Sequence, residues 1–229
     1  LDKSKLVNSV FSKVYKKYDL MNDIMSFGIH RIWKDKFIDW MNPCSGSKLI
    51  DVASGTGDIA KLFSKHSNNL SEITCIEPNS KMFEEGKKNL KNLKNINWLK
   101  AQAEKLPVKD NTYDFYSISY GIRNVNDINK ALKEAYRVLK PGGRFMCLEF
   151  SKIDNETLNF FYKQYSKTIP IIGKYVVGTS EPYKYLIESI DEFYSQNQLI
   201  KLMKDNGFSH TEYRNLSGGV SAIHSGWKT

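Results

Sequence analysis

One short stretch restricts the fold of this chain more than any other, namely 48–52 followed by 53–58. The first part, Lys-Leu-Ile-Asp-Val, is an apolar run of strand length, and the second, Ala-Ser-Gly-Thr-Gly-Asp, leads into a helical pattern. Gly55 and Gly57 let the backbone approach a ligand where a β-carbon would collide. Such a strand, turn and helix are typical of α/β sheets, which bind ligands outside the carboxyl ends of their strands.

Strand and helix patterns alternate on both sides of this turn. Further strands are predicted over 72–77, 96–101, 113–119, 144–150, 210–215 and 220–227. Helices are predicted over 7–18, 22–41, 59–63, from 80 onward, and over 126–139, 155–167 and 196–206, with an irregular insertion at 169–173 and 176–179. Strand–helix alternation implies a parallel sheet covered on both faces. The predicted fold class is therefore α/β, with a doubly wound, mostly parallel seven-stranded sheet and extra N-terminal helices.

The length of 229 residues suits a single domain. We expect an N-terminal helical lid over 1–43, a cofactor-binding core over 44–150, and substrate-side helices with the last strands over 151–229. No apolar run reaches the roughly 18 residues of a membrane-spanning helix, so we expect a soluble or peripherally bound chain. It begins with Leu1 rather than methionine, which predicts a missing N-terminal segment.

Charge and cysteine content restrict the partners. A net charge of +9 favours anionic partners, either nucleic acid or acidic lipid, although lysines on solvated helix faces account for much of it. The three cysteines have neither metal-ligand nor disulfide spacing, so no metal site is predicted.

Two cofactors compete for the glycine turn. Gly55-x-Gly57-x-x-Ala60 fits a relaxed dinucleotide fingerprint, and Glu77 ends the next strand, where a carboxylate can accept hydrogen bonds from both ribose hydroxyls. Asp51, just before the turn, would meet the amino group of a methionine but repel a pyrophosphate. Two predicted helices precede the first strand, whereas dinucleotide domains often begin with that strand. These features favour S-adenosylmethionine.

The segment after the third strand supports the same cofactor. It reads Ala101-Gln-Ala-Glu104, and Gln102 with the backbone of Ala103 could read an adenine edge. The two predicted ends of the site thus suit an adenosine and a methionine.

With these residues in view, the chain resembles the ubiquinone/menaquinone biosynthesis C-methyltransferases. The matching stretches are 18–31, 51–58, 120–125, 137–144, 148–151, 185–190 and 215–226, which together span nearly the whole chain. The stretch 137–144 is common among methyltransferases, whereas 18–31 (Tyr-Asp-Leu-Met-Asn-Asp-Ile-Met-Ser-Phe-Gly-Ile-His-Arg) and 120–125 (Tyr-Gly-Ile-Arg-Asn-Val) are much more specific.

The resemblance implies methylation of a ring carbon on a polyprenylated quinol. The cofactor site carried over or predicted consists of Asp51, Ser54, Gly55, Thr56, Gly57, Glu77, Pro78, Gln102, Ala103 and Ser119, with Tyr18, Met21 and Asn22 as a lid. Three residues depart from the family's pattern: Ser54 replaces a glycine, Glu77 an aspartate and Gln102 an asparagine. The longer side chains at 77 and 102 would shift the ribose or adenine slightly.

The chemistry needs a nucleophilic ring carbon behind the sulfonium methyl group and the exclusion of water. Arg123 is the first choice for stabilising a phenolate, because its turn follows the fourth strand on the cofactor side and arginine stays protonated. A structural ion pair is the alternative role. Tyr120 and Asn124 could orient the ring, and His30 and His224 are possible bases, although lone histidines are more often structural.

The expected partners are the quinol, which is a benzoquinol, a naphthoquinol or both, and an anionic membrane surface, with no nucleic acid. The resemblance implies a homodimer or a quinone-biosynthesis complex, at the inner face of the respiratory membrane, on the matrix side if the source is eukaryotic. Two other functions are possible from the sequence: an RNA or DNA methyltransferase, and a non-catalytic member of a quinone-biosynthesis complex. Ser119-Tyr-Gly-Ile-Arg123 differs from the Asn-Pro-Pro-aromatic turn used on flipped bases. The intact Asp51, Gly55, Gly57 and Arg123 oppose a scaffold role.

Overall fold

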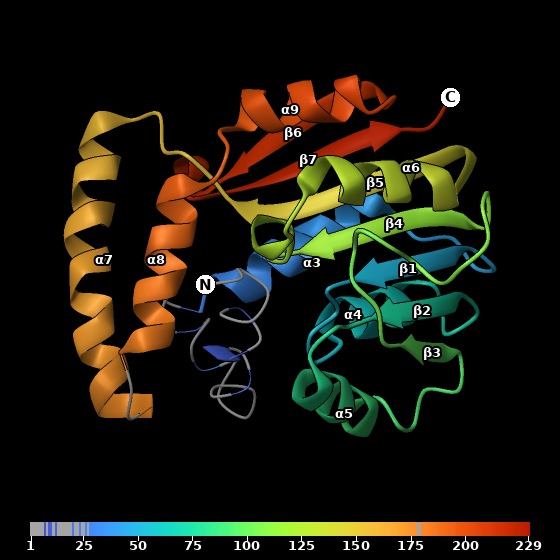
Figure 1. The fold of residues 1–229 in the computed structure, drawn as a ribbon, viewed down its shortest axis with the longest axis horizontal. Helices are drawn as coiled ribbons and strands as arrows, with labels where there is room; N and C mark the ends of the chain where they lie inside the picture. The colour runs from blue at the N-terminus through green and yellow to red at the C-terminus, as the bar shows by residue number, and fades with distance from the viewer. Residues whose placement is uncertain are drawn as a thin grey trace.

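A computed structural model describes residues 7, 9, 10, 12, 20, 23, 26, 28–177 and 180–229. Seven strands form one sheet in the order β3-β2-β1-β4-β5-β7-β6. They are β1 Lys48–Val52, β2 Glu72–Ile76, β3 Ile96–Leu99, β4 Tyr113–Ser119, β5 Leu139–Phe150, β6 Ser209–Leu216 and β7 Ser221–Trp227. The first five strands pair in parallel, whereas β7 is antiparallel to both β5 and β6. The predicted mostly parallel, seven-stranded sheet is confirmed (Figure 1).

Helices cover both faces of the sheet (Figure 1). They are α3 His30–Met41, α4 Asp58–His66, α5 Ser80–Asn89, α6 Ile128–Val138, α7 Glu156–Val177, α8 Glu181–Glu192 and α9 Gln196–Asp205. Neighbouring strand residues enter opposite cores: Leu49 packs with side chains of α3 and α4, and Ile50 packs with side chains of α6 and α9. This two-sided burial is what an apolar strand of a doubly wound sheet requires.

The order of the strands fixes the place of a ligand site. After β1 the chain winds outward to β3, and it then returns to place β4 beside β1 on the other side. The carboxyl ends of β1 and β4, at Val52 and Ser119, lie side by side, and the chain leaves them in opposite directions where the winding reverses. Open α/β sheets bind their ligands at this switch point.

Two predictions for helical segments are wrong. The helix predicted over 22–41 is divided by a turn at Gly28, where φ is +75°, and α3 begins at His30. The irregular insertion predicted at 169–173 instead belongs to α7, which runs through Pro170. A proline inside a helix loses one backbone hydrogen bond, but the neighbouring Ile169 is fully buried in the core, and this packing offsets the loss. The helix predicted over 7–18 lies mostly outside the described residues.

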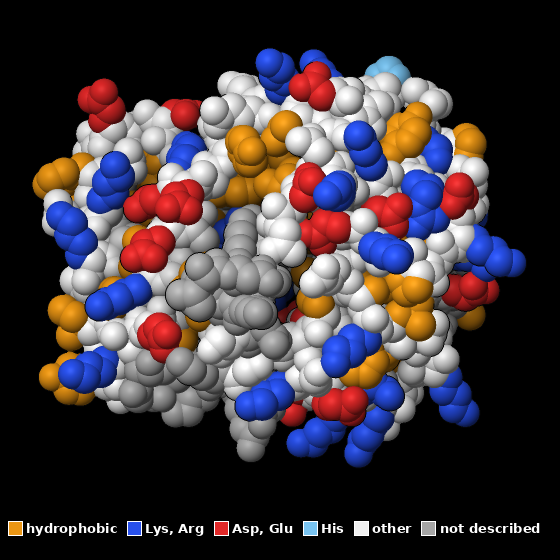
Figure 2. Space-filling view, in the orientation of Figure 1, with side chains coloured by type: hydrophobic (Ala, Val, Ile, Leu, Met, Phe, Trp, Pro, Cys, Tyr) orange, Lys and Arg blue, Asp and Glu red, His pale blue; other side chains and the backbone are white. Residues whose placement is uncertain are grey.

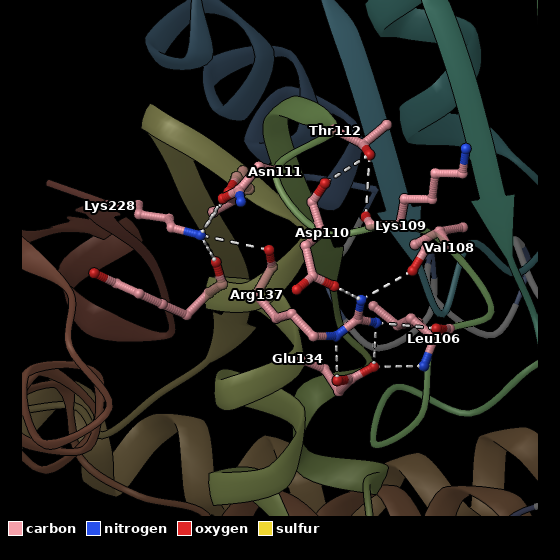
Figure 3. A network of polar contacts seen from close by, with 11 residues as sticks. Leu106, Val108, Lys109, Asp110, Asn111, Thr112, Glu134, Arg137 and Lys228 are labelled. Carbon is pink, nitrogen blue, oxygen red and sulfur yellow. Dashed lines mark hydrogen bonds and ion pairs between the residues drawn. The ribbon is translucent and has the colours of Figure 1, made fainter.

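The stretch Lys140-Pro-Gly-Gly143 ends α6 as predicted, but β5 already begins at Leu139. The register with β4 shifts between Tyr113 and Phe115, so these four residues form a bulge. Lys228 ties the bulge to α6, because its backbone forms hydrogen bonds with Gly142 and Gly143 in the bulge. Its ammonium donates to the carbonyls of Tyr136 and Leu139 and to Asn111 (Figure 3). This network lies at the end of the sheet away from the switch point.

No helix among the described residues has both the length and the apolar character needed to cross a bilayer. Within the same residues, no group of three or more His, Cys, Asp or Glu side chains is arranged to hold a metal ion.

Candidate active site

A cavity of about 300 Å³ opens at the switch point. Its wall comes from the loops after β1, β2, β3 and β4. The predicted site residues in this wall are Gly55, Glu77, Pro78, Gln102, Ala103, Ser119, Tyr120 and Asn124. Sequence reasoning missed Ala53, Asn79, Met82 and Gly121 in the same wall. The sequence therefore placed all four loops correctly around one cavity.

A second, small cavity of about 30 Å³ lies beside the first. Ala53, Gly55, Ser119 and Tyr120 line both, so the two form neighbouring parts of one site. The small cavity adds Lys34, Asp51, Ser54, Thr56, Asp58 and Ile59. A ligand with a bulky end and a small charged end would match this pair of cavities.

The two glycines of the turn are needed for different structural reasons. Gly55, with φ +57°, lines both cavities, as predicted for a close approach of the backbone to a ligand. Gly57, with φ +91°, lines neither cavity. A β-carbon at Gly57 would lie only 2.5 Å from the Leu90 side chain. Gly57 therefore allows α4 to start and to pack closely against its neighbours, and its contact with the cofactor stays a prediction.

Glu77 lines the large cavity and also fixes the glycine turn. One carboxylate oxygen accepts the Gly55 N–H at 2.9 Å, and the other accepts the Asn79 N–H at 2.8 Å. Burial raises the pKa of Glu77 to about 7, although both backbone hydrogen bonds oppose this shift. Each oxygen can accept a second hydrogen bond, so ribose hydroxyls can still bind there. The sequence predicted the ribose role but not the contact with Gly55.

Asp51 is the most unusual group of the small cavity. The hydroxyl of Ser117 donates to its Oδ1 at 2.6 Å, whereas Oδ2 is buried without a hydrogen-bond partner among the described residues. Burial raises the pKa of Asp51 to about 7. Ser119 Oγ, which lines both cavities, is buried and unpartnered in the same way. Buried polar atoms normally have partners, so this pair would suit a ligand that brings a donor group.

Lys34 brings a positive charge to the same cavity. Its ammonium forms an ion pair with Asp58 Oδ2 at 2.5 Å, and its side chain is only 9% exposed. Lys34 comes from α3 and Asp58 begins α4, so no local pattern connects them. The small cavity thus holds Asp51 beside the Lys34–Asp58 ion pair. An amino acid placed there would set its ammonium against Asp51, and its carboxylate would share the Lys34 ammonium with Asp58.

The part of the large cavity's wall that contains Glu104 and Asn126 is held in place by contacts between loops. Glu104 Oε1 accepts the Asn126 N–H at 2.6 Å and the Asp127 N–H at 3.3 Å, which ties the loop after β3 to the loop after β4. Gln102 and Ala103 precede this anchor, in the position predicted for reading an adenine edge.

The turn after β4 carries Tyr120 and a short 3-10 helix, η2 Ile122–Asn124. Tyr120 has a φ of +53°, and its hydroxyl lies 3.3 Å from Ser221 Oγ. Asn124 lines the cavity, and its Oδ1 accepts the Tyr185 hydroxyl of α8 at 2.9 Å. A tyrosine held in a sparsely populated conformation is typical of a functional site. Tyr120 and Asn124 therefore stand where the sequence predicted them.

Arg123, the predicted catalytic residue, does not line either cavity. Its Nη1 donates to Glu149 Oε1 at 2.6 Å and to the Tyr120 carbonyl at 2.8 Å, and its Nε donates to Ser189 Oγ at 3.3 Å. Arg123 is thus a buried ion-pair partner behind the turn, which was the alternative role. Its stabilisation of a phenolate stays a prediction.

The two histidines considered as bases also lie outside the cavity walls. Burial lowers the pKa of each to about 4. His30 Nδ1 lies 3.0 Å from Ser26 Oγ, and His224 Nε2 lies 3.2 Å from the Gln196 carbonyl. Both are structural residues in this arrangement. Tyr18, Met21 and Asn22, the predicted lid, lie outside the described residues.

S-adenosylmethionine fits the site. Its ammonium would supply the donor that Asp51 Oδ2 and Ser119 Oγ lack, and its carboxylate would meet Lys34. Glu77 would hold the ribose, and the loop of Gln102 would hold the adenine. A dinucleotide, by contrast, would place a pyrophosphate against the buried carboxyl of Asp51.

Comparison with known proteins agrees with this assignment. The ubiE/COQ5 methyltransferase family matches residues 1–228. The ubiquinone/menaquinone biosynthesis C-methyltransferase UbiE of Rickettsia bellii is 53% identical over 99% of this chain and 94% of its own length. The protein of the same name from Rickettsia prowazekii is 51% identical over 97% of this chain and 92% of its own length.

Solved structures share the fold at low identity. A methyltransferase from Thermotoga maritima, described as a possible histamine N-methyltransferase, has a TM-score of 0.67 and 23% identity, covering 96% of this chain and 99% of its own. A methyltransferase from Aquifex aeolicus has a TM-score of 0.68 and 18% identity, covering all of both chains. These likenesses show the fold alone. With the site and the sequence relatives together, the chain belongs to the ubiE/COQ5 methyltransferase family and is an S-adenosylmethionine-dependent methyltransferase.

Proposed function

We propose that this enzyme methylates a ring carbon of a polyprenylated quinol, as the names of its relatives indicate for them. The substrates would be the benzoquinol of ubiquinone synthesis, the naphthoquinol of menaquinone synthesis, or both. The observation that carries the cofactor half of the proposal is the pair of unpartnered buried atoms, Asp51 Oδ2 and Ser119 Oγ. Asp51 lines the small cavity, and Ser119 lines both. The family relationship carries the quinol half.

The site residues would divide the work of binding and orientation. Bound S-adenosylmethionine supplies a methyl group that is electrophilic because its sulfur is positively charged. Asp51, Lys34 and Glu77 would fix the two ends of that molecule, and the walls at Ser119 and Tyr120 would exclude water from the space between them. The Asn124 amide, fixed by Tyr185, would orient a ring hydroxyl.

The substrate becomes reactive when that hydroxyl loses its proton, because a phenolate is a stronger carbon nucleophile than a phenol. A positive charge near the developing anion lowers the barrier. Arg123 lies directly behind the turn that carries Tyr120 and Asn124, but Glu149 already compensates its charge. Any contribution of Arg123 therefore acts through the turn or through a rearrangement of the pair.

The same proposal places the enzyme peripherally on the inner face of a respiratory membrane. A quinol with a prenyl tail resides in the bilayer, and the net charge of +9 favours an anionic surface.

Methyl transfer from labelled S-adenosylmethionine to a short-chain demethylated quinol tests the activity directly. We expect label on the ring carbon of a benzoquinol, a naphthoquinol or both, and none on RNA or DNA. Turnover on nucleic acid, or cofactor binding without transfer to either quinol, would reject the proposal. Asp51→Asn should abolish most of the transfer and serves as the control for cofactor dependence.

A further inference from the structure

Helix α7 is the outermost element on its side of the molecule, with α8 between it and the sheet (Figure 1). Its inner side packs on the protein: Ile169 is fully buried and Ser166 is 8% exposed. Its outer side carries large apolar residues in water, namely Phe160 at 58%, Phe161 at 64%, Ile171 at 61% and Tyr175 at 86% exposure. We call these four residues the α7 ridge. Exposed aromatic residues gathered on one helix face are a feature of interaction sites.

Basic residues accompany the ridge on one flank. Lys163, Lys167 and Lys174 are all exposed on α7. At about 100° per residue they fall within roughly 40° of one another, and the α7 ridge occupies the adjoining arc of roughly 100°. Figure 2 shows hydrophobic and basic side chains side by side along the edge of the molecule formed by α7. An apolar ridge bordered by lysines is the pattern of a helix that lies in a membrane interface.

The charge favours an anionic bilayer over a second copy of this chain. A symmetric contact through the ridge would bring two identical lysine rows together, and like charges repel. The single acidic residue of α7 is Glu156, at its first turn, so the helix carries a net charge of +2 from three lysines and one glutamate. The neighbouring acidic side chains, such as Glu181, Glu188 and Glu192, belong to α8, which lies between α7 and the sheet.

We propose that the α7 ridge and its lysine row dock the enzyme on the surface of an anionic lipid bilayer. Phe160, Phe161, Ile171 and Tyr175 enter the boundary between headgroups and acyl chains, while Lys163, Lys167 and Lys174 contact the lipid phosphates. The inference rests on the proposed function, since only a membrane-resident substrate gives docking a purpose. It adds the docking helix and its orientation, with the ridge toward the lipid and α8 toward the protein.

Co-sedimentation of the full chain with vesicles tests the docking helix. The vesicles contain equal amounts of phosphatidylcholine and phosphatidylglycerol, and pure phosphatidylcholine vesicles provide the comparison. We expect binding to the mixed vesicles that weakens as salt rises from about 0.1 M to about 1 M, where screening shortens from about 10 Å to about 3 Å. Replacing Lys163, Lys167 and Lys174 together by Gln should lower the partition coefficient by about fivefold per lysine, on the order of 100-fold in all.

A matched control carries the same loss of charge elsewhere. Lys88, Lys91 and Lys94 are exposed on and after α5, so their joint replacement by Gln should leave most of the vesicle binding intact. For the apolar part, Phe160→Ser with Phe161→Ser should abolish binding, whereas Leu70→Ser, at a residue 66% exposed in the loop after α4, should not. Circular dichroism and S-adenosylmethionine affinity check that each variant is folded.

Each outcome decides the question. If the variant without Lys163, Lys167 and Lys174 bound vesicles as well as the control variant without Lys88, Lys91 and Lys94, net charge alone would explain the binding. That result would overturn the proposal. A wild-type dimer that Phe160→Ser with Phe161→Ser converts to monomers would assign the ridge to a second copy instead. Vesicle binding is measured without any quinol, so it can succeed while methyl transfer to a short-chain quinol fails, and the docking helix is judged separately from the proposed function.

Discussion

Arg123 and Glu149 form an ion pair of 2.6 Å in which the arginine side chain is 3% exposed and the carboxylate is fully buried. The pair joins the turn after β4 to the carboxyl end of β5, which fixes the backbone beneath Tyr120 and Asn124. Burial raises the pKa of Glu149, and the charge of Arg123 is the main influence opposing that rise. A buried pair of this kind contributes little net stability, but either partner alone is costly.

Single and double substitutions at this pair separate its structural part from its chemical part. Arg123→Met should lower the free energy of unfolding by about 3–5 kcal/mol, because it leaves a buried carboxylate without compensation. Arg123→Met with Glu149→Leu should recover most of that loss, as measured by urea denaturation. In this folded double variant we expect kcat to fall on the order of 100-fold if Arg123 stabilises a phenolate. A kcat equal to that of the wild type, with unchanged cofactor affinity, would leave Arg123 a purely structural role.

Asp51 should make cofactor binding depend on pH. With a pKa of about 7 it is largely protonated at pH 5.5, and only its ionised form pairs with the ligand's ammonium. Affinity for S-adenosylhomocysteine should therefore rise as pH increases from about 5.5 to 7 and level off above that. Isothermal titration calorimetry at each pH measures the effect. Methylthioadenosine lacks the amino acid, so its binding should show only the part of this pH dependence that Glu77 causes. The pKa of Glu77 is also about 7. An identical pH dependence in Asp51→Asn would contradict the assignment.

Lys34 should recognise the carboxylate of the cofactor. Lys34→Met should weaken S-adenosylmethionine binding about tenfold or more, because an ammonium–carboxylate contact in a buried site is lost. Binding of decarboxylated S-adenosylmethionine should change little in the same variant. Lys36→Met is the control, since Lys36 lies on the same helix but is exposed. If both ligands lost affinity equally, Lys34 would act by holding Asp58 and α4 rather than by contacting the carboxylate.

The sequence predicted the parts of this molecule that local patterns determine. The bounds of β1 and β4 were predicted to the residue, because each is a mostly apolar run with polar residues or glycines at its ends. The loop positions of Glu77, Gln102 and Ser119 followed from the strands before them. Lys34 was missed because its partner Asp58 is 24 residues away on another helix.

Other misses have the same origin in tertiary packing. Tyr185 fixes Asn124 across 61 residues, and nothing in either neighbourhood signals the contact. The segment 169–173 was predicted to be irregular, but α7 continues through Pro170, and Ile169 is buried in the core. Gly57 was predicted as a ligand contact, and the position of Leu90 adds that close packing also requires a glycine there, which no local pattern indicates.

Arg137 shows how a widespread sequence feature can serve the scaffold rather than the chemistry. Its guanidinium donates to Glu134, to Asp110, and to the carbonyls of Leu106 and Val108 (Figure 3). It thereby clamps the loop before β4 against α6. Hydrogen bonds to Glu134 and Asp110 raise the pKa of Arg137, so it stays charged under all ordinary conditions.

Arg137→Ala should lower the free energy of unfolding by about 2–3 kcal/mol, because two carbonyls and two carboxylates lose a shared charged donor. Arg137→Lys should recover little of this, since an ammonium cannot reproduce the planar fork that contacts four groups. Urea denaturation measures both variants, with Lys133→Ala as a control at an exposed position of the same helix. Full stability in Arg137→Lys would mean that charge alone holds the loop. Because the clamp lies away from the cavities, S-adenosylmethionine affinity in the folded variants should stay within about twofold of the wild type, which separates a loss of scaffold stability from a loss of the site.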